Sequence, residues 1–220
     1  MPESASAFSR VDFVTSAGPS GGLPPDDLPE IAFAGRSNVG KSSAINALAK
    51  RKRLAFVSKT PGRTQTINFF DLSGRGRLVD LPGYGYARVP QSVRAQWDKL
   101  VGGYLGARAA LAGVVLLMDA RHPFTVHDEH LLAWLRPAGR RLLVLLSKCD
   151  KLSRQERAKV LASARAPHPQ GRGRGGAALF ESIRRGRRRG ARAARWMAPS
   201  SAAGIKNPRQ RGSKPGGKTP

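Results

Sequence analysis

The sequence is organised around one octapeptide, Gly35-Arg36-Ser37-Asn38-Val39-Gly40-Lys41-Ser42, which fits the phosphate-binding pattern G-x-x-x-x-G-K-[ST]. The apolar residues 31–34 before it predict a buried strand, and residues 43–48 after it predict the start of a helix. In that context the backbone N–H groups of the loop would face phosphate oxygens. Lys41 would reach the β- and γ-phosphates, and the Ser42 hydroxyl would bind Mg²⁺. A glycine-rich loop without a ligand is the alternative.

Length and cysteine content favour one α/β domain with tails in a reducing compartment. The chain has 220 residues and a single cysteine, Cys149, which excludes an intramolecular disulfide framework. The apolar run at residues 111–118 is too short to cross a membrane, and the N-terminus does not resemble a signal peptide. We therefore expect a soluble cytoplasmic protein that is monomeric and has no membrane partner.

The net charge of +25 is spread unevenly along the chain. Residues 151–220 contain 19 Lys and Arg against 2 Asp and Glu, whereas residues 1–150 contain 20 against 12, so the net charges are +17 and +8. A run of positive charge is compatible with a solvated tail and also with a surface for nucleic-acid phosphates.

Apolar runs and turn signals predict strands that alternate with helices. The predicted strands are residues 11–15, 31–34, 66–71, 77–80, 111–118 and 141–146, and the predicted helices are 43–50, 92–106, 126–135 and 153–164. This alternation predicts an α/β fold with a mostly parallel central sheet and helices on both faces. Ligands of such sheets bind at the carboxyl ends of the strands, where the motifs of this sequence fall.

Two tetrapeptides follow predicted strands and extend the nucleotide-site hypothesis. Asp80-Leu81-Pro82-Gly83 has the form D-x-x-G, in which the aspartate would hold Mg²⁺ through water and Gly83 N–H could meet the γ-phosphate. Ser147-Lys148-Cys149-Asp150 resembles the [N/T]-K-x-D element, with serine at its first position. A carboxylate at Asp150 would accept hydrogen bonds from guanine N1–H and the exocyclic amine, which adenine cannot offer. A charged turn after a strand is the alternative for either tetrapeptide alone.

A third element, Gly62-Arg63-Thr64-Gln65-Thr66, fits switch I of GTPases, whose threonine completes the Mg²⁺ shell. The predicted metal ligands are therefore Ser42, Thr64 and, through water, Asp80. Longer strings are more specific: FVTSA at 13–17, LPEIAFAGRSNVGKSS at 28–43, TPGRTQTINFF at 60–70, VDLPGYGYA at 79–87 and MDAR at 118–121. From about residue 13 to about residue 159 they closely resemble the bacterial EngB family, also called YihA or YsxC. This family belongs to the TrmE-Era-EngA-EngB-septin-like GTPase superfamily.

The resemblance implies a Ras-like P-loop GTPase fold that binds GTP or GDP with Mg²⁺ and hydrolyses GTP slowly. It also implies a role in assembling the large ribosomal subunit, in contact with the subunit and its RNA, and a requirement for normal cell division and septation. By resemblance, Asn38 would help to bind K⁺ beside the phosphates; a polar loop residue that satisfies backbone groups is the alternative. Tyr84 occupies the place of the glutamine that orients the attacking water in Ras-type enzymes. Hydrolysis should therefore be slow, and no catalytic residue is assigned.

Two other functions compete with a GTP-dependent switch. One is a basic RNA-binding protein in which a degenerate nucleotide site is only structural. The intact site residues argue against it: Lys41, Ser42, Thr64, Asp80 and Asp150. The other is an ATP-using P-loop enzyme, which Asp150 and the lack of a catalytic carboxylate after the strand ending at Asp80 disfavour.

The C-terminal region departs from the family pattern. We divide the chain into an N-terminal extension (1–27), a G domain (28–165, which would normally extend to about 197) and a basic low-complexity segment (166–220) that is either a disordered tail or a frameshift product. The family needs a last strand, a Ser-Ser or Ser-Ala loop and a closing helix, which residues 166–220 do not supply. The nearest match to the loop is Leu179-Phe180-Glu181-Ser182, and residues 184–195 are too rich in Arg, Gly and Ala to bury a helix face.

The genetic code allows an explanation for this departure. Codons chosen for residues 175–197 and read one base later can give VVQLFSSPSGVGVDEARALLDGW, which contains a strand, a Ser-Ser loop and an amphipathic helix in that order. We therefore favour translation out of frame from about residue 166. A true basic tail that binds ribosomal RNA is the alternative.

Overall fold

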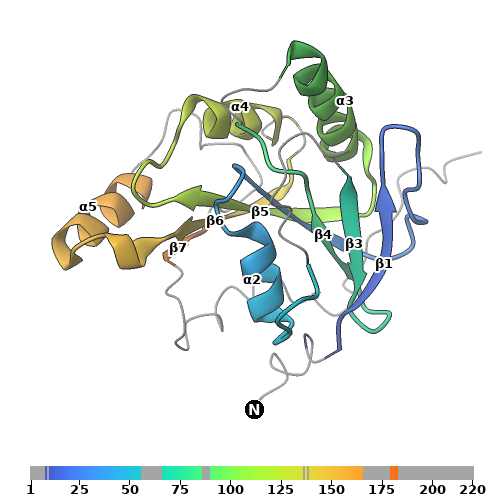
Figure 1. Ribbon diagram of the computed structural model, residues 1–220, viewed down its shortest axis with the longest axis horizontal. Coiled ribbons are helices and arrows are strands. Elements are labelled where there is room, and N and C mark those ends of the chain that lie inside the picture. The colour runs from blue at the N-terminus through green and yellow to red at the C-terminus, as the bar shows by residue number, and fades with distance from the viewer. Residues whose placement is uncertain are drawn as a thin grey trace, which may run out of the picture.

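One mixed sheet forms the centre of the computed structural model, which describes residues 8, 10–55, 66–85, 90–135, 137, 139–165 and 179–182 (Figure 1). Its strand order is β1-β3-β4-β2-β5-β6-β7. The strands are β1 (Asp12–Ala17), β2 (Glu30–Gly35), β3 (Ile67–Asp71), β4 (Arg77–Asp80), β5 (Leu111–Asp119), β6 (Arg141–Ser147) and β7 (Leu179–Ser182). The helices are α2 (Lys41–Leu48), α3 (Gln91–Ala107), α4 (Val126–Leu135) and α5 (Arg154–Arg165), with a 3-10 turn, η1, at Cys149–Lys151.

The predicted α/β fold with a mostly parallel sheet is confirmed. β2 pairs in parallel with β4 and β5, and β5-β6 and β6-β7 are also parallel. The pairs β1-β3 and β3-β4 are antiparallel, so among the described strands β3 alone runs opposite to the rest. Because β2, β4, β5 and β6 share a direction, the segments that follow them emerge at one edge of the sheet.

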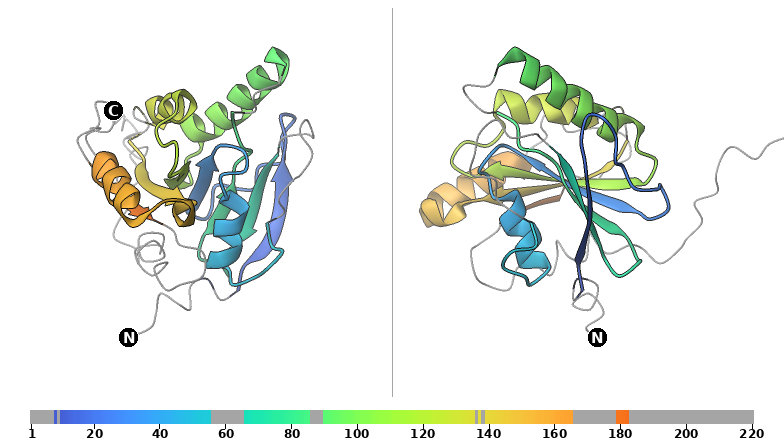
Figure 2. Two further views of the ribbon diagram at one scale, coloured as in Figure 1. Left: turned by 60° about the vertical axis from the view of Figure 1, so that its left-hand side comes forward. Right: turned by 45° about the vertical axis from the view of Figure 1, so that its right-hand side comes forward.

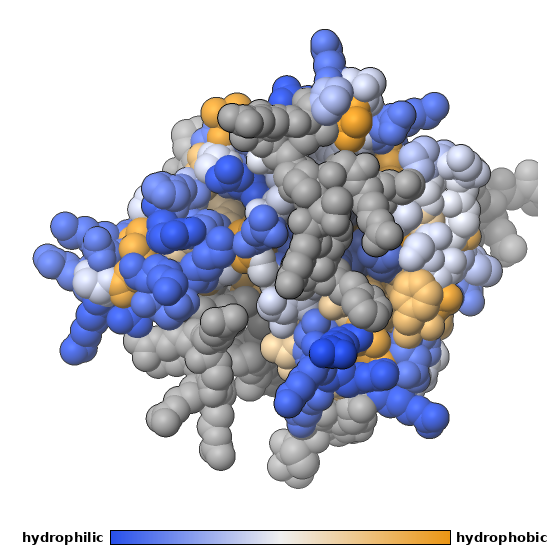
Figure 3. Space-filling model, viewed as in Figure 1, coloured by the Kyte–Doolittle hydropathy of each residue, from blue (hydrophilic) through white to orange (hydrophobic). Residues whose placement is uncertain are grey.

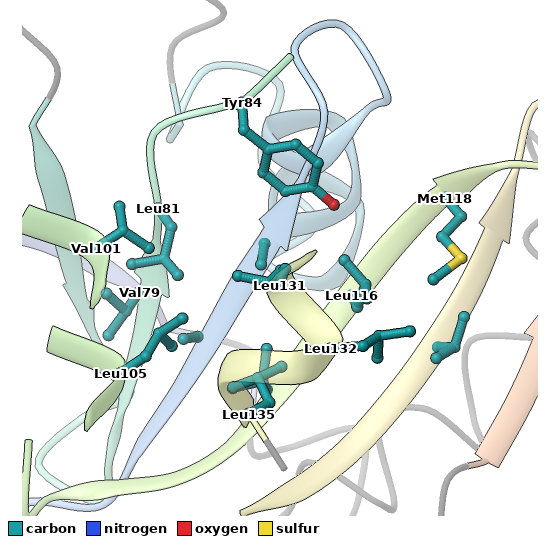
Figure 4. Close-up of a cluster of buried hydrophobic side chains, with 14 of the residues drawn as sticks. Val79, Leu81, Tyr84, Val101, Leu105, Leu116, Met118, Leu131, Leu132 and Leu135 are labelled. Carbon is teal, nitrogen blue, oxygen red and sulfur yellow. The ribbon is translucent and has the colours of Figure 1, made fainter. Parts of the chain in front are cut away.

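Alternating apolar residues give the sheet two buried faces. α3 and α4 cover one face, where Leu105, Leu116 and Leu131 belong to one buried cluster (Figure 4). α2 packs on the other face, where Phe33, Ile45 and Leu117 belong to a second cluster. The views in Figure 2 show α2 on the side of the sheet opposite α3 and α4. None of the described helices is long and apolar enough to cross a membrane.

The predicted elements agree closely with the observed ones up to Arg165. The strand expected at residues 11–15 is β1, which joins the main sheet beside β3. The helix expected from Ser153 is α5, and its first turn is a capping box in which Ser153 and Glu156 each bond the backbone N–H of the other. The expectation that no final strand follows was wrong, because residues 179–182 form β7 beside β6. An edge strand needs only backbone pairing, which an Arg-rich context does not prevent.

A buried ion cluster fixes the end of β2 that is remote from the octapeptide. Glu30 is fully buried and accepts hydrogen bonds from Tyr104 Oη and Arg108 Nε, both at 2.9 Å. Arg77 Nη1 lies 3.7 Å from the same carboxylate. Burial raises the pKa of Tyr104, and the neighbouring Glu30 raises it further. The cluster therefore holds β2 in place without taking part in the candidate site.

Candidate nucleotide site

The loop between β2 and α2 has the backbone geometry of a phosphate-binding loop. Gly35 and Gly40 have φ angles of 151° and 108°, a region that favours glycine. A side chain at Gly35 would also come within 2.6 Å of Leu117 O, so the loop needs glycine there for space as well. With these two turns, the first N–H groups of α2 point out of the helix toward the loop, where they can bind an anion.

Lys41, Ser42 and Asp80 converge below this loop from α2 and β4. Lys41 Nζ donates to Gly35 O at 3.1 Å, and Ser42 Oγ donates to Asp80 Oδ2 at 3.1 Å. Burial lowers the pKa of Lys41, and the charge of Asp80 opposes that shift. Burial likewise raises the pKa of Asp80, while Lys41 and Ser42 act in the other direction. Each group is thus costly to keep charged in the bare site, and a phosphate with its cation would relieve that cost.

Buried polar atoms without a partner show that the site fits Mg²⁺ and phosphate. Within the described part of the chain, Arg36 Nε, Ser37 Oγ and Asp80 Oδ1 are buried and have no hydrogen-bond partner. No described group of three or more His, Cys, Asp or Glu side chains could hold a metal by itself. Mg²⁺ commonly takes one or two protein ligands and completes its shell with phosphate and water. Ser42 and Asp80 could therefore hold the ion, which would neutralise charge on the phosphates.

The D-x-x-G segment lies directly against the phosphate loop. Ser37 N–H donates to Tyr84 O at 2.9 Å, and a side chain added at Gly83 would come within 2.7 Å of Ser37 Oγ. Leu81 N–H donates to Phe33 O at 3.0 Å, which ties the segment to β2. Gly83 N–H therefore belongs to a segment in contact with the loop that would carry the γ-phosphate.

The Tyr84 side chain, in contrast, turns away from the loop into the core (Figure 4). Its hydroxyl donates to Asp128 Oδ1 on α4 at 2.7 Å, and only 7% of the residue is exposed. Burial, the charge of Asp128 and this hydrogen bond all raise the pKa of Tyr84. The Tyr84 hydroxyl therefore donates its hydrogen bond inside the protein and does not orient water as a glutamine at this position would.

The second tetrapeptide follows β6 at the same edge of the sheet. Ser147 Oγ donates to Met118 O at 3.1 Å, so this hydroxyl joins β6 to β5. Lys148 has a positive φ of 55°, and Cys149 is buried with Sγ 3.2 Å from Leu146 O. Asp150 follows Cys149 within the turn η1, and its side chain is exposed. A carboxylate held at the surface by a buried turn is available to an incoming base.

Asp119, at the end of β5, is a residue of this edge that the sequence reasoning did not single out. Its Oδ2 lies 3.1 Å from Lys148 Nζ, and its two carboxylate oxygens accept from Arg121 Nε and Nη2. The bond from Arg121, together with Lys148, lowers the pKa of Asp119. Asp119 and Ser147 are register partners on neighbouring parallel strands. Two polar residues that end adjacent strands were the signal that could have predicted this contact.

Of the predicted switch I and K⁺-site residues, only Thr66 and Asn38 belong to the part of the chain that the structure describes. Gly62, Arg63, Thr64 and Gln65 lie outside the described residues, and the Thr66 hydroxyl donates to Asn68 Oδ1 at 3.3 Å at the start of β3. Asn38 is exposed at the tip of the loop with a φ of 61°. Its part in K⁺ binding stays a prediction.

The fold and the arrangement of loop, lysine, serine and carboxylate place the chain in the P-loop nucleotide-binding class. A model of the 50S ribosome-binding GTPase family matches residues 30–148. The "Probable GTP-binding protein EngB" of Aromatoleum aromaticum is 60% identical over 158 residues, which cover 72% of this chain and 73% of that protein. Its namesake in Thiobacillus denitrificans is 50% identical over 197 residues and covers 89% of this chain and 95% of that protein. The chain therefore belongs to the EngB family of GTP-binding proteins.

A solved structure supports the fold independently. The crystal structure of a probable GTP-binding protein EngB superposes with a TM-score of 0.51 at 24% identity, covering 69% of this chain and 88% of that one. Era from Aquifex aeolicus bound to GDP and aluminium fluoride gives a TM-score of 0.52 at 18% identity over 71% of this chain. At these identities the comparison bears on the fold alone.

Proposed function

We propose that this protein is a GTP/GDP switch that hydrolyses GTP slowly. The observation that carries the proposal is the gathering of phosphate-loop, Mg²⁺ and guanine elements at one edge of the sheet. Ser42 donates to Asp80 there, Lys41 donates to Gly35 O of the phosphate loop, and Asp150 follows the parallel strand β6 at the same edge. A guanine nucleotide with Mg²⁺ accounts for each of these groups.

Slow hydrolysis follows from Tyr84. A side chain that orients the attacking water must reach the γ-phosphate, whereas the Tyr84 hydroxyl donates to Asp128 inside the core. Gly83 and Lys41 can stabilise a bound γ-phosphate without activating water. The protein would then hold the GTP state until a partner supplies the missing group.

We propose the large ribosomal subunit and its RNA as that partner, with the protein acting in the cytoplasm as an assembly switch needed for cell division and septation. The matching family model describes 50S ribosome-binding GTPases. The net charge of +8 over residues 1–150 also favours an RNA-rich partner. A basic RNA-binding protein with a structural nucleotide site is the alternative.

Titration with fluorescent GDP, GTP and ATP tests the nucleotide part. We expect binding of guanine nucleotides only, and its loss in Lys41→Ala, because Lys41 is the buried cation of the phosphate loop. Lys99→Ala, at an exposed position on α3, is the matched control and should bind as the parent does. Absence of binding in the parent protein would leave the RNA-binding alternative.

Co-sedimentation with purified 50S subunits tests the partner. We expect more protein to sediment with a non-hydrolysable GTP analogue than with GDP, and Lys41→Ala should abolish that difference. Equal sedimentation in both nucleotide states would contradict a switch.

A further inference from the structure

A strongly basic surface with an exposed aromatic ring lies at the far end of α2 from the nucleotide site. Its members, which we call the α2–β1 surface, are Arg10, Phe13, Lys50, Arg51, Lys52 and Arg53, all of them exposed. Figure 3 shows hydrophilic side chains gathered at the lower right of the molecule, with hydrophobic surface directly beside them. α2 has eight residues, so this surface is separated from the phosphate loop by about 12 Å of helix. It is therefore distinct from the nucleotide site.

Hydrogen bonds join the two halves of this surface. Arg51 Nη1 donates to Val11 O at 2.7 Å and to Asp12 Oδ1 at 3.0 Å, so the basic turn after α2 touches the start of β1. Phe13 is the register partner of Phe70, which belongs to the same buried cluster as Val11, so Phe13 lies on the α2 face of the sheet. Its ring meets Phe70 edge to face at 5.9 Å, and 56% of Phe13 stays exposed. The ring is thus held in place beside the cations while much of it faces solvent.

Local structure accounts for only part of this charge. Arg10 Nε and Arg51 Nη1 lie 3.9 Å and 3.0 Å from the carboxylate of the neighbouring Asp12. Five cations against that carboxylate leave a local net charge of +4. The negative end of α2 favours a cation nearby, but the effect is confined to the last turn. Neither the helix end nor Asp12 explains why an exposed phenyl ring directly follows the carboxylate that Arg10 and Arg51 approach.

We propose that the α2–β1 surface binds single-stranded RNA, with a base stacked on Phe13 and flanking phosphates paired with Lys52 and Arg53. This inference rests on the proposed function and adds to it the surface that meets ribosomal RNA and the kind of RNA it takes. A basic groove with an aromatic stacking platform is the usual way in which proteins bind single strands. A second copy of the chain is disfavoured because two such surfaces would repel each other. An anionic membrane is disfavoured because one phenyl ring offers little apolar area to insert.

Fluorescence anisotropy with a labelled twelve-nucleotide uridine RNA tests the proposal on the full chain. Phe13→Ala should weaken binding about tenfold at fixed salt, since stacking contributes a factor of that size per base. The dependence of the affinity on salt should stay unchanged, because no charge is removed. Val126→Ala, which shortens an apolar residue that is 80% exposed on α4, should bind RNA as the parent does.

Charge is tested by the double variant Lys52→Gln/Arg53→Gln. Its slope of log affinity against log salt should fall by about 1.4, the value for two phosphate contacts on a single strand. Arg94→Gln/Lys99→Gln removes the same charge from exposed positions on α3 and should leave the slope close to that of the parent. Every variant retains residues 166–220, so any background from their charge is common to all.

The outcomes separate this inference from the proposed function. Binding of fluorescent GDP is measured on the same samples, so a failed nucleotide site would be seen without affecting the RNA result. Equal RNA binding by Phe13→Ala and the parent would overturn the proposal. It would also be overturned if Phe13→Ala changed only the sedimentation of a dimer or only the binding to phosphatidylserine vesicles, which would identify a second copy or a membrane as the occupant.

Discussion

At the scale of single residues, the neighbours Gly83 and Tyr84 serve different parts of the molecule. Gly83 lies so close to the phosphate loop that an added Cβ would come within 3.0 Å of Lys41 Nζ. The Tyr84 side chain leaves in the direction of α4, where its hydroxyl meets Asp128. If Gly83 moves on nucleotide exchange, Tyr84 must either move together with Asp128 or lose the buried hydrogen bond to it. The core thus resists movement of this segment.

Tyr84→Phe should destabilise the protein without changing its chemistry. Loss of the bond to Asp128 should lower the free energy of unfolding by about 1–2 kcal/mol. The rate of GTP hydrolysis should stay within about twofold of the parent, because the hydroxyl does not face the nucleotide. Thermal melts and single-turnover hydrolysis measure the two effects. The matched control is Tyr104→Phe, which removes a comparable buried bond to Glu30. A tenfold loss of hydrolysis in Tyr84→Phe alone would give the hydroxyl a role in the reaction.

Asp150→Asn should relax the choice of base. Guanine N1–H and the exocyclic amine need two acceptor oxygens, and the amide offers only one. Sites built on such hydrogen bonds discriminate strongly between bases while the bonds are intact. The preference for GDP over ADP should fall at least about tenfold, as measured by competition against fluorescent GDP. Asp98→Asn on α3 serves as the control for a lost carboxylate. An unchanged preference for GDP over ADP would show that residues 147–150 do not recognise the guanine base.

At the scale of elements, the segment after β4 connects the phosphate loop to two helices. Trp97 Nε1 on α3 donates to Pro82 O at 3.0 Å, and the Tyr84 ring meets Trp97 edge to face at 5.6 Å. Asp128 on α4 also accepts from the backbone N–H and hydroxyl of Thr125. Since Asp128 is held on both sides, α3 and α4 should follow the nucleotide state through this segment.

Gly83→Ala should separate the two nucleotide states. The added Cβ would come within 2.7 Å of Ser37 Oγ and 2.9 Å of Ser37 Cα, so the segment must move away from the loop. Affinity for GTP should then fall more than affinity for GDP, because only GTP offers a γ-phosphate to Gly83 N–H. Stopped-flow titrations with both nucleotides give the ratio. At Gly103, within α3, an added Cβ would meet nothing within 4 Å, so Gly103→Ala should leave the ratio unchanged. Equal losses for GTP and GDP would contradict a γ-phosphate contact.

The sequence predicted these elements well where short-range patterns determine them. Apolar runs predicted β2, β5 and β6, and the glycine spacing predicted the phosphate loop, because local geometry sets both. The bond between Tyr84 and Asp128 spans 44 positions along the chain, and no periodicity encodes such a contact. β7 was missed for a similar reason. Its backbone pairs with the open edge of β6, and composition carries little information about edge pairing.

At the scale of the whole molecule, the two faces of the sheet are covered unequally. Among the described residues, α3, α4 and α5 pack on one face, and α2 is the only helix whose buried residues belong to the cluster on the other. That second cluster extends as far as Leu143 and Leu145 on β6, which are at most 2% exposed. A closing helix over β6, which the shifted reading of residues 175–197 would supply, belongs on this face. Since β7 is present beside β6, the elements that the frameshift would remove are the guanine loop and that helix.

The frameshift hypothesis predicts that the chain as written is less stable than one in which the shifted reading is restored from about residue 166. Loss of a core helix removes a large share of a total stability of about 5–15 kcal/mol. The written chain should therefore melt at a lower temperature and aggregate more readily than the restored one.

GDP should raise the melting temperature of the written chain less than that of the restored chain, because the restored Ser-Ser loop would contact the base. On this hypothesis, limited proteolysis should cleave the written chain first within residues 184–195, where its arginines are densest. Differential scanning calorimetry of both versions, with and without GDP, decides the question. If the written chain melts cooperatively at the same temperature as the restored one, residues 166–220 are a genuine part of the protein, and their charge acts in RNA binding instead.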